Sequence, residues 1–381
     1  MNESRIVIDL EMLYCNNSSI TEEFRPVMSG NCFYINKKVF ITGHTGFKGS
    51  WLCLMLKKLG AEVYGYSLNP RTSPALFNIL SLDKEIHSTI GDIRDFQTLE
   101  RAYVEANPDV VFHLAAQPIV RDSYKDPKYT YETNVIGTVN ILECLRHHPG
   151  AVSFLNVTTD KVYENNDIEG HAFTEDEKLD GFDPYSNSKS CSELVTHSYK
   201  KSFFSEESAP AISTARAGNV IGGGDFSNDR IIPDCVRATI MKEKIIVRNP
   251  NSIRPYQHVL EPLSVYLMIA MMQGEDKKYA GYYNIGPMDE DCITTGRLAD
   301  AFVKYWGESA EWINVAEANA PHEANFLKLD CSKVRETFNW NPVWDAESAI
   351  KETVDWYKSW NNGKDMLEYT KKQIDSFLNY L

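Results

Sequence analysis

Long apolar runs, paired-cysteine motifs and an excess of basic charge are all missing from this chain. No apolar run reaches the roughly 18 residues that a membrane-spanning helix needs, and the first residues carry Glu3, Asp9 and Glu11 instead of the apolar core of a secretory signal. Eight cysteines are scattered without CxxC spacing, and the adjacent His147 and His148 lack zinc-ligand spacing, so we expect reduced thiols and no metal. The net charge of −14 argues against nucleic acid and anionic membranes as partners. These absences predict a cytoplasmic globular protein.

Short apolar strands and helical segments alternate from about residue 38. Strands alternating with helices form a parallel sheet that is covered on both sides. The pattern loosens after about residue 217, where prolines recur. We therefore predict an α/β fold, a doubly wound parallel sheet with a smaller C-terminal substrate-binding lobe. The expected strands are 39–41, 62–66, one ending near 90, 110–114 and 152–157, and the expected helices are 50–59, 99–106, 130–146, 187–201, about 345–360 and 366–380.

The chain divides into three parts in this interpretation. Residues 1–35 fit the alternating pattern poorly, and we expect an N-terminal extension that is disordered or packed on the surface. Residues 36–217, together with about 258–286, form the predicted cofactor-binding domain. The remaining segments, about 218–257 and 287–381, form the predicted substrate-binding lobe.

A glycine-rich loop follows the first predicted strand and opens the first predicted helix. Gly43, Gly46 and Gly49 allow a tight turn and a close approach of the backbone to a pyrophosphate at the helix N-terminus. Thr45 and Phe47 belong to the same loop. A glycine pattern alone is weak evidence, but the strand–loop–helix context predicts a dinucleotide site of the Rossmann type.

The end of the second strand lacks the acidic residue that usually binds the ribose hydroxyls of NAD. The segment from Tyr66 to Arg71 has tyrosine, serine and asparagine there, so these residues leave NAD and NADP as alternatives. Asp92 and Ile93 follow the third strand and are expected at the adenine edge. Small residues at 115 and 116, both alanine, follow the fourth strand and suit a position beneath a cofactor.

One segment is basic although the chain as a whole is acidic. Residues 212–258 contain seven Lys or Arg and four acids. Arginine and lysine side chains bind phosphate oxygens, so we interpret this segment as a candidate pocket for a phosphorylated small molecule. A solvated basic face is the alternative.

Two polar segments carry the clearest chemistry. Asp160 is delivered to the end of a buried strand, and Tyr185 and Lys189 lie four positions apart, on one face of a helix. A nearby ammonium group lowers the pKa of a phenol from its usual value near 10, so Tyr185 is expected to act as a base. A phenolate base and a carboxylic acid over one cofactor suggest oxidation coupled to elimination. Taken alone, Asp160 would be an acid that caps the following loop.

These motifs together resemble the extended short-chain dehydrogenase/reductase family from about residue 36 onward. Within it, the chain looks most like the sugar-nucleotide 4,6-dehydratases, because Thr159 and Asp160 supply a pair whose acid related epimerases lack. Dehydratases of dTDP-glucose and GDP-mannose usually have a glutamate next, whereas Lys161 is similar to the CDP-glucose group. The supporting segments are 43–52, 113–116, 134–138, 183–189, 216–225, 253–262, 283–286 and 329–333.

The resemblance implies NAD as the cofactor and the conversion of CDP-glucose to CDP-4-keto-6-deoxyglucose and water. Tyr185, assisted by Lys189, takes the proton of the 4-hydroxyl as hydride leaves C4, and Thr159 or Thr158 hydrogen-bonds the same oxygen. Asp160 protonates the leaving 6-hydroxyl, and hydride returns to C6. The role of Lys161 stays open: it takes the C5 proton if it is partly neutral, or it holds Asp160 or stabilises the enolate.

Further contacts follow from the same resemblance. Asn134 is expected at the cofactor, and Asn219, Arg230, Arg254 and Asn284 at the diphosphate and ribose of the substrate. His322 is a further candidate for a substrate contact, although a surface histidine beside Glu323 is more often a solvated pair. Relatives pair the helices that correspond to 130–146 and 187–201, which implies a homodimer or a dimer of dimers.

Three alternatives remain from the sequence. The chain is also compatible with a 4,6-dehydratase of another nucleotide sugar, such as dTDP-glucose or GDP-mannose. A sugar-nucleotide 4-epimerase is the second alternative, although it needs no acid at Asp160. A catalytically silent, nucleotide-sensing protein is a remote third, because the glycines, Tyr185 and Lys189 are all present.

Overall fold

The computed structural model describes residues 32–168, 170–307, 310–315 and 327–381. Its centre is a seven-stranded sheet in the order β11-β6-β5-β4-β1-β2-β3, in which every pair of neighbours is parallel. Because all carboxyl ends of these strands meet at one edge, the loops that follow them share one site. The strands are β1 (Lys38–Thr42), β2 (Glu62–Ser67), β3 (His87–Ile90), β4 (Val110–His113), β5 (Ser153–Thr159), β6 (Ala211–Ala217) and β11 (Tyr282–Ile285).

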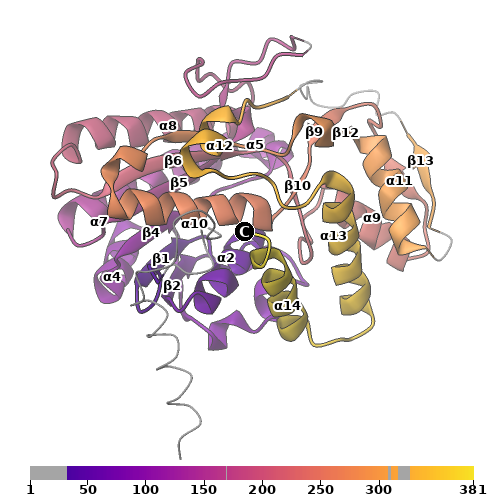
Figure 1. Cartoon of the computed structure of the whole chain (residues 1–381), viewed down its shortest axis with the longest axis horizontal. Helices are drawn as coiled ribbons and strands as arrows, with labels where there is room; N and C mark the ends of the chain where they lie inside the picture. Colours follow the sequence, from indigo (N-terminus) through magenta and orange to yellow (C-terminus); the bar gives the residue numbers. More distant parts are fainter. Residues whose placement is uncertain (1–31, 169, 308–309, 316–326) are drawn as a thin grey trace, which may run out of the picture.

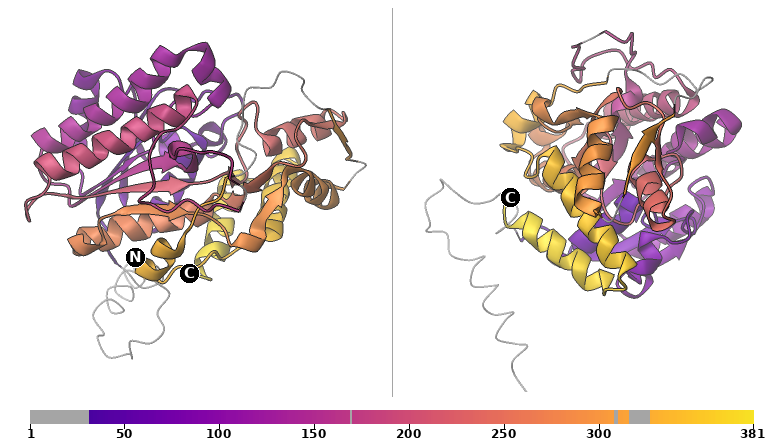
Figure 2. Two further views of the ribbon diagram at one scale, coloured as in Figure 1. Left: turned by 90° about the horizontal axis from the view of Figure 1, so that it is seen from above. Right: turned by 90° about the vertical axis from the view of Figure 1, so that its right-hand side faces the viewer.

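Helices cover both faces of the sheet, as Figures 1 and 2 show. On one face the apolar side chains of α2 (Phe47–Lys58) and α10 (Leu260–Glu275) join the larger core. On the other face, α4 (Phe96–Ala106) and α7 (Gly137–His147) form a second core with Phe40 and Phe154, and α8 (Pro184–Phe203) packs beside α7. This arrangement confirms the predicted doubly wound α/β fold. The connecting segments on these faces are α3 (Leu76–Ile79), η1 (Leu82–Lys84), α5 (Val120–Lys125), α6 (Pro127–Tyr131), η2 (Glu132–Ile136), η3 (Asp160–Val162) and η4 (Lys277–Tyr279).

A smaller lobe lies at the other end of the molecule from α7 and α8 (Figure 1). It contains short two-stranded sheets in which β12 pairs with β9 and β13 with β8, and α11 packs against α13. Its elements, with the short strands and helices that connect it to the main sheet, are β7 (Val220–Ile221), α9 (Ile231–Ile240), β8 (Ile245–Val247), β9 (Ile253–Pro255), β10 (Gln257–His258), η5 (Asp289–Asp291), β12 (Cys292–Thr294), α11 (Thr295–Trp306), β13 (Trp312–Asn314), α12 (Ser332–Phe338), α13 (Ala346–Asn361) and α14 (Met366–Leu378).

The structure refines several expectations. The expected helix 130–146 is three elements, because the π-helical turn η2 separates α6 from α7. The predicted extension 1–35 lies mostly outside the described residues, but Tyr34 is buried and donates a hydrogen bond to the carbonyl of Leu267, 2.7 Å away. Residues 33 and 34 therefore pack onto the cofactor-binding domain. The partition into domain and lobe otherwise stays a prediction.

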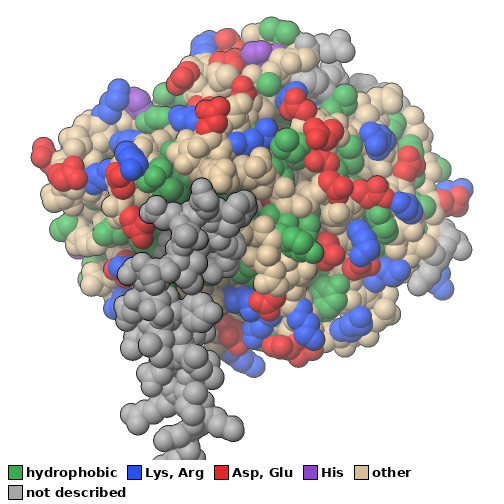
Figure 3. All heavy atoms as spheres, in the orientation of Figure 1, with side chains coloured by type: hydrophobic (Ala, Val, Ile, Leu, Met, Phe, Trp, Pro, Cys, Tyr) green, Lys and Arg blue, Asp and Glu red, His purple; other side chains and the backbone are tan. Residues whose placement is uncertain are grey.

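The charged groups and the cysteines of the described residues can be set beside the expectations from composition. Acidic and basic side chains are interspersed over the face in Figure 3. Within the described ranges, no helix is long and apolar enough to cross a membrane, and no cluster of three or more metal-binding side chains occurs. Cys32 departs from the expectation because it is disulfide-bonded. The described cysteines with free thiols are Cys53, Cys144, Cys191, Cys235, Cys292 and Cys331.

Candidate active site

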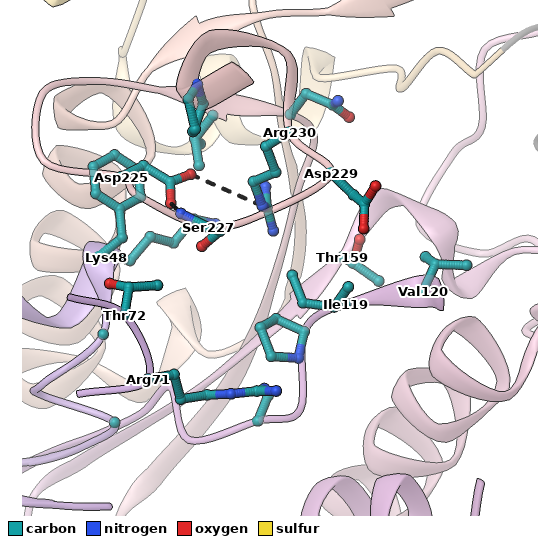
Figure 4. A pocket seen from close by; sticks show the side chains of 18 of the residues that line it. Lys48, Arg71, Thr72, Ile119, Val120, Thr159, Asp225, Ser227, Asp229 and Arg230 are labelled. Carbon is teal, nitrogen blue, oxygen red and sulfur yellow. Dashed lines mark hydrogen bonds and ion pairs between the residues drawn. The ribbon is translucent and has the colours of Figure 1, made fainter. Parts of the chain in front are cut away.

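A pocket of about 730 Å³ opens where the carboxyl ends of the central strands face the lobe. The main sheet contributes the loop after β1 and the ends of β2, β5 and β6, and the lobe contributes the segments around α9, β8 and β9. Side chains from both parts point into the same space in Figure 4, where Lys48 and Arg71 lie across from Arg230 and Asp229. The pocket thus joins the predicted cofactor loop to the predicted phosphate-binding segment.

The glycine loop forms a cradle for a dinucleotide. Gly43 has φ +82°, and a Cβ on Gly49 would lie 2.2 Å from the carbonyl oxygen of Gly43. Gly46 caps α2 without a side-chain hydrogen bond, so the first backbone N–H groups of the helix stay open to an anion. The space that these missing side chains leave fits a pyrophosphate at the helix N-terminus. Thr45 and Phe47 line the same pocket.

The residues predicted to bind the adenosine part of the cofactor line one part of the pocket wall. Ser67, Asn69 and Arg71 line the pocket after β2, in the place where the sequence lacks an acid. Asp92 also lines it, and its carboxylate accepts hydrogen bonds from the guanidinium of Arg94, which holds the pKa of Asp92 below its ordinary value. Further predicted cofactor residues on the wall are Ile93, Ala115 and Ala116.

Asn134 lies behind this wall instead of on it. Its amide oxygen accepts from the backbone N–H of Gln117 at 2.8 Å, and its amide nitrogen donates to Ser188 Oγ at 2.8 Å. Ser188 in turn donates to the carbonyl of Tyr185 at 2.7 Å. Asn134 therefore ties the loop after β4 to the start of α8.

Asp160 is buried at the junction of β5 and η3, where it lines the pocket. Thr159 donates a hydrogen bond to its Oδ1 at 2.9 Å, and Oδ2 is buried with no hydrogen-bond partner in the described chain. Burial raises the pKa of this carboxyl, and nearby cationic groups, led by Lys161, lower it in part. A raised pKa favours the protonated form of the carboxyl, which is the form that can donate a proton.

Tyr185 and Lys189 project from the first turns of α8 into the same pocket. The pKa of Tyr185 is not lowered in this arrangement, contrary to the expectation. Burial raises that pKa to about 12, and a hydrogen bond with Thr159 and the charge of Arg230 oppose it. Lys189 donates instead to the carbonyl of Val157 at 3.0 Å, and burial lowers its own pKa to about 8.

Of the two threonines that precede Asp160, Thr159 is the one beside the tyrosine. Thr158 donates its hydroxyl to Glu193 at 2.5 Å, away from Tyr185, whereas Thr159 contacts both Asp160 and Tyr185. This favours Thr159 as the partner of a substrate oxygen.

Lys48 was missed by the sequence analysis. It lies in the glycine loop and is partly buried near Asp160 and Arg230, and this burial lowers its pKa to about 7. Its ammonium group is 3.4 Å from the hydroxyl of Tyr266. A lysine between two loop glycines was the available signal, but only the fold shows that it faces the acid. Lys161 also lines the pocket.

Three of the five predicted substrate contacts line the pocket: Asn219, Arg230 and Arg254. Asn284 does not line the pocket, because its side chain is 0% exposed. Its amide oxygen accepts a hydrogen bond from Tyr163, and its amide nitrogen donates to the carbonyls of Phe173 and Asp330. Its place next to β6 buries it one layer behind the site. His322 lies outside the described residues.

Comparison with known proteins identifies the family. The protein-family model described as GDP-mannose 4,6 dehydratase matches residues 40–353 of this chain. The chain belongs to this family. This confirms the resemblance that the motifs indicated.

Individual members of the dehydratase family are similar over most of their length. CDP-glucose 4,6-dehydratase of Salmonella typhimurium is 46% identical over 91% of this chain and 97% of its own. dTDP-glucose 4,6-dehydratase 1 of Escherichia coli is 28% identical over 84% and 93%. Among solved structures, dTDP-glucose 4,6-dehydratase of Bacillus anthracis in complex with NAD superposes with a TM-score of 0.71 at 23% identity, covering 87% and 99%. UDP-glucose 4-epimerase of Thermotoga maritima gives 0.74 at 22% identity, covering 85% and 99%. At such low identity these two structures support the fold.

Proposed function

We propose that this chain is an NAD-dependent CDP-glucose 4,6-dehydratase, which converts CDP-glucose to CDP-4-keto-6-deoxyglucose and water. The observation that carries the proposal is the meeting of a dinucleotide cradle, Tyr185 and the buried acid Asp160 in one pocket. The nucleotide sugar is assigned from the 46% identity to the Salmonella enzyme. Lys161 after Asp160 agrees with that assignment.

The glycines 43, 46 and 49 hold the pyrophosphate of NAD, and Asp92 holds its adenine edge in this proposal. When bound, NAD supplies a hydride acceptor for C4 that gives the hydride back at C6. The oxidised cofactor also brings a positive charge, which favours the phenolate form of a neighbouring tyrosine. The residues of the chain handle the protons.

Tyr185 removes the proton from the sugar 4-hydroxyl, and Thr159 hydrogen-bonds the same oxygen. The ketone at C4 then acidifies the proton at C5. Loss of that proton expels the 6-hydroxyl, and Asp160 protonates it so that it leaves as water. Lys161 either takes the C5 proton or holds Asp160. Exchange of the C5 hydrogen with deuterated solvent, measured in Lys161→Met, separates the two roles. Exchange needs only the base, so it is lost if Lys161 is the base and continues if Lys161 only holds Asp160.

Charge also places the rest of the substrate. Arg230 and Arg254 line the lobe side of the pocket with Asn219, and guanidinium groups suit diphosphate oxygens. Three of the seven basic residues of segment 212–258, Arg230, Arg248 and Arg254, line the pocket, which supports the predicted phosphate site.

The proposal includes a dimer formed by α7 and α8. These helices pack side by side, and two apolar side chains at them are about half-exposed: Leu194 of α8 is 54% exposed, and Ile136, the last residue of η2 directly before α7, is 49% exposed. Leu142 of α7 is buried within the chain and does not contribute to this surface. A cytoplasmic location completes the proposal, since the enzyme needs both NAD and a nucleotide sugar.

The first test is incubation of the purified protein with CDP-glucose, with and without added NAD. The expected result is a 4-keto-6-deoxy product, detected by its absorbance in alkali. Product from CDP-glucose but not from dTDP-glucose supports both the elimination and the nucleotide. A 4-epimeric sugar without a persistent ketone would contradict the dehydratase proposal and favour an epimerase.

A further inference from the structure

A buried ion pair lies directly behind the candidate catalytic residues. Glu193 of α8 and Arg216 of β6 are 1% and 2% exposed. Arg216 donates from Nε to Oε1 and from Nη2 to Oε2 of Glu193, both at 3.0 Å. Thr214 donates to Oε2 at 2.7 Å, and Thr158 donates to Oε1 at 2.5 Å. Both carboxylate oxygens thus accept two hydrogen bonds each.

Glu193 is linked to the catalytic groups along two routes. It follows Lys189 by one turn and Tyr185 by two turns of α8, so the three share a helix face. It also fixes the hydroxyl of Thr158, the residue that precedes Thr159 at the end of β5. The other end of Arg216 donates to the hydroxyl of Tyr163 at 2.8 Å, and Tyr163 donates to Asn284. This chain of contacts crosses the carboxyl ends of β5, β6 and β11.

We propose that Glu193, held in place by Arg216, is a positioning residue for the hydride-transfer step: its carboxylate keeps Lys189 charged beneath Tyr185 and locks the strand end that carries Thr159. The inference rests on the proposed function, because it concerns the same catalytic pair.

The electrostatics around Lys189 support this role. Burial lowers the pKa of the Lys189 ammonium to about 8, and Glu193 is the neighbour that opposes the shift. Lys48 of α2 and His113 of β4 also face Lys189. Burial lowers the pKa of Lys48 to about 7, so Lys48 repels the Lys189 charge only while it is protonated, and burial keeps His113 neutral. The titratable groups facing Glu193 itself are Arg216, Tyr163, Tyr282 of β11, and Lys189 and His197 on its own helix.

A purely structural ion pair would behave differently from this positioning device. Breaking a buried pair leaves an uncompensated charge and destabilises the fold, whereas replacing both partners with neutral groups is often tolerated. Glu193→Gln combined with Arg216→Gln keeps two complementary amides and removes both charges. If the pair only stabilises the fold, this double variant restores a normal enzyme. If Glu193 acts on Lys189, the double variant folds and still has an altered pH profile.

The experiment compares kcat against pH for the wild type, Glu193→Gln and the double variant, with bound NAD verified in each. The alkaline limb reports the group that must stay protonated. We expect this limb to move to lower pH, by roughly one pH unit in Glu193→Gln and in the same direction by less in the double variant. A limb that stays in place in the double variant, with any rate loss uniform across pH, would overturn the inference.

Two further variants keep the test decisive. Glu193→Asp keeps the negative charge but moves the carboxylate away from Lys189, so it replaces the other variants if they fail to fold. A loss of rate confined to alkaline pH supports the inference. A loss of rate that is uniform across pH contradicts it. Glu347→Gln makes the same chemical change in an exposed pair with Lys304 and is the control. If the wild-type protein forms no ketone from CDP-glucose, that result contradicts the proposed function and not this inference. The alkaline limb of the pH profile is then measured with any nucleotide sugar that reduces the cofactor.

Discussion

The two oxygens of Asp160 have different surroundings, and this difference leads to a prediction for the elimination step. Oδ1 is bonded by Thr159, while Oδ2 is buried without a partner among the described residues, and burial raises the pKa of the group. Asp160→Asn removes the acid but leaves Tyr185 and the cradle unchanged. We expect product formation to fall by about 10²- to 10⁴-fold, while oxidation at C4 continues and reduced nicotinamide accumulates.

The measurement for Asp160→Asn is a single-turnover assay with both signals recorded. Asp180→Asn, a surface acid paired with Lys178, is the matched control and should behave as the wild type. Loss of both the reduced nicotinamide signal and the product would show that Asp160 is needed for oxidation or for binding, and would contradict its role as the acid.

Arg230 carries a second prediction at the residue scale. It lines the pocket opposite the glycine loop and lies 3.9 Å from Asp225 (Figure 4). Arg230→Lys keeps the charge but loses the planar fork that matches phosphate oxygens. We expect KM for CDP-glucose to rise about tenfold, which corresponds to about 1.4 kcal/mol, with a smaller change in kcat. Steady-state kinetics beside Arg101→Lys on the exposed side of α4 test this, and an unchanged KM would remove Arg230 from the diphosphate site.

At the scale of elements, the junction of β1 and α2 depends on glycine. A Cβ at residue 49 would overlap the carbonyl oxygen of Gly43, so the loop has to shift. We expect Gly49→Ala to weaken NAD binding by about 100-fold or more, since the displaced loop no longer presents its backbone to the pyrophosphate. Titration calorimetry with NAD measures the effect. Gly363→Ala is the control. The φ of +69° at this position strains an alanine by about 1 kcal/mol, but an added Cβ meets open space and the position lies outside the pocket.

A buried glutamate at the start of α10, Glu261, leads us to predict that the free energy of unfolding depends on pH. Glu261 accepts hydrogen bonds from the backbone N–H groups of Val343 and Trp344, and burial raises its pKa to about 8. The folded protein therefore keeps a proton that the unfolded chain releases above about pH 4.5. The contribution of this group to the free energy of unfolding is greatest below that pH and falls as the pH rises towards 8.

Glu261→Gln removes this titration while an amide oxygen still accepts both hydrogen bonds. We expect the variant to be more stable than the wild type at pH 8, by roughly 1–3 kcal/mol, and nearly equal to it at pH 5. Denaturant unfolding at the two pH values gives the difference, and comparison of the two proteins cancels all other titrations. A variant that is less stable than the wild type at pH 8 would contradict the predicted sign.

Elements whose signals are local could be predicted, and contacts between distant elements could not. The glycine loop was predictable because Gly43, Gly46 and Gly49 lie within one turn that only a few residue types can form. The break of the predicted helix 130–146 at η2 was not, because its apolar pattern continues through the π turn. Asn284 was placed in the site by resemblance, yet β11 pairs beside β6 and buries it among backbone carbonyls. The hydrogen bond between Thr158 and Glu193 could not be predicted, because only the folded sheet with α8 packed on it brings these two residues together.

At the scale of the whole molecule, the position of the exposed apolar side chains leads to a prediction about the proposed dimer. The α7 and α8 pair lies at one end, and the lobe with its pocket wall at the other (Figure 1). Leu194 on α8 and Ile136 at the end of η2, directly before α7, are half-exposed, and Cys191, Val135 and Val195 near them in the sequence are partly exposed. A dimer through this surface buries apolar side chains and leaves the lobe free.

Leu194→Asp places a charge in that surface without disturbing the core, because the side chain is already 54% exposed. We expect the wild type to elute with at least twice the chain mass of 43.4 kDa, and the variant as a monomer, since burial of an unpaired carboxylate opposes association. Light scattering after size-exclusion chromatography measures both. Met241→Asp, an equally exposed apolar site at the end of α9 in the lobe, should stay dimeric. If Met241→Asp dissociates and Leu194→Asp does not, the interface lies on the lobe, and the assignment of α7 and α8 is wrong.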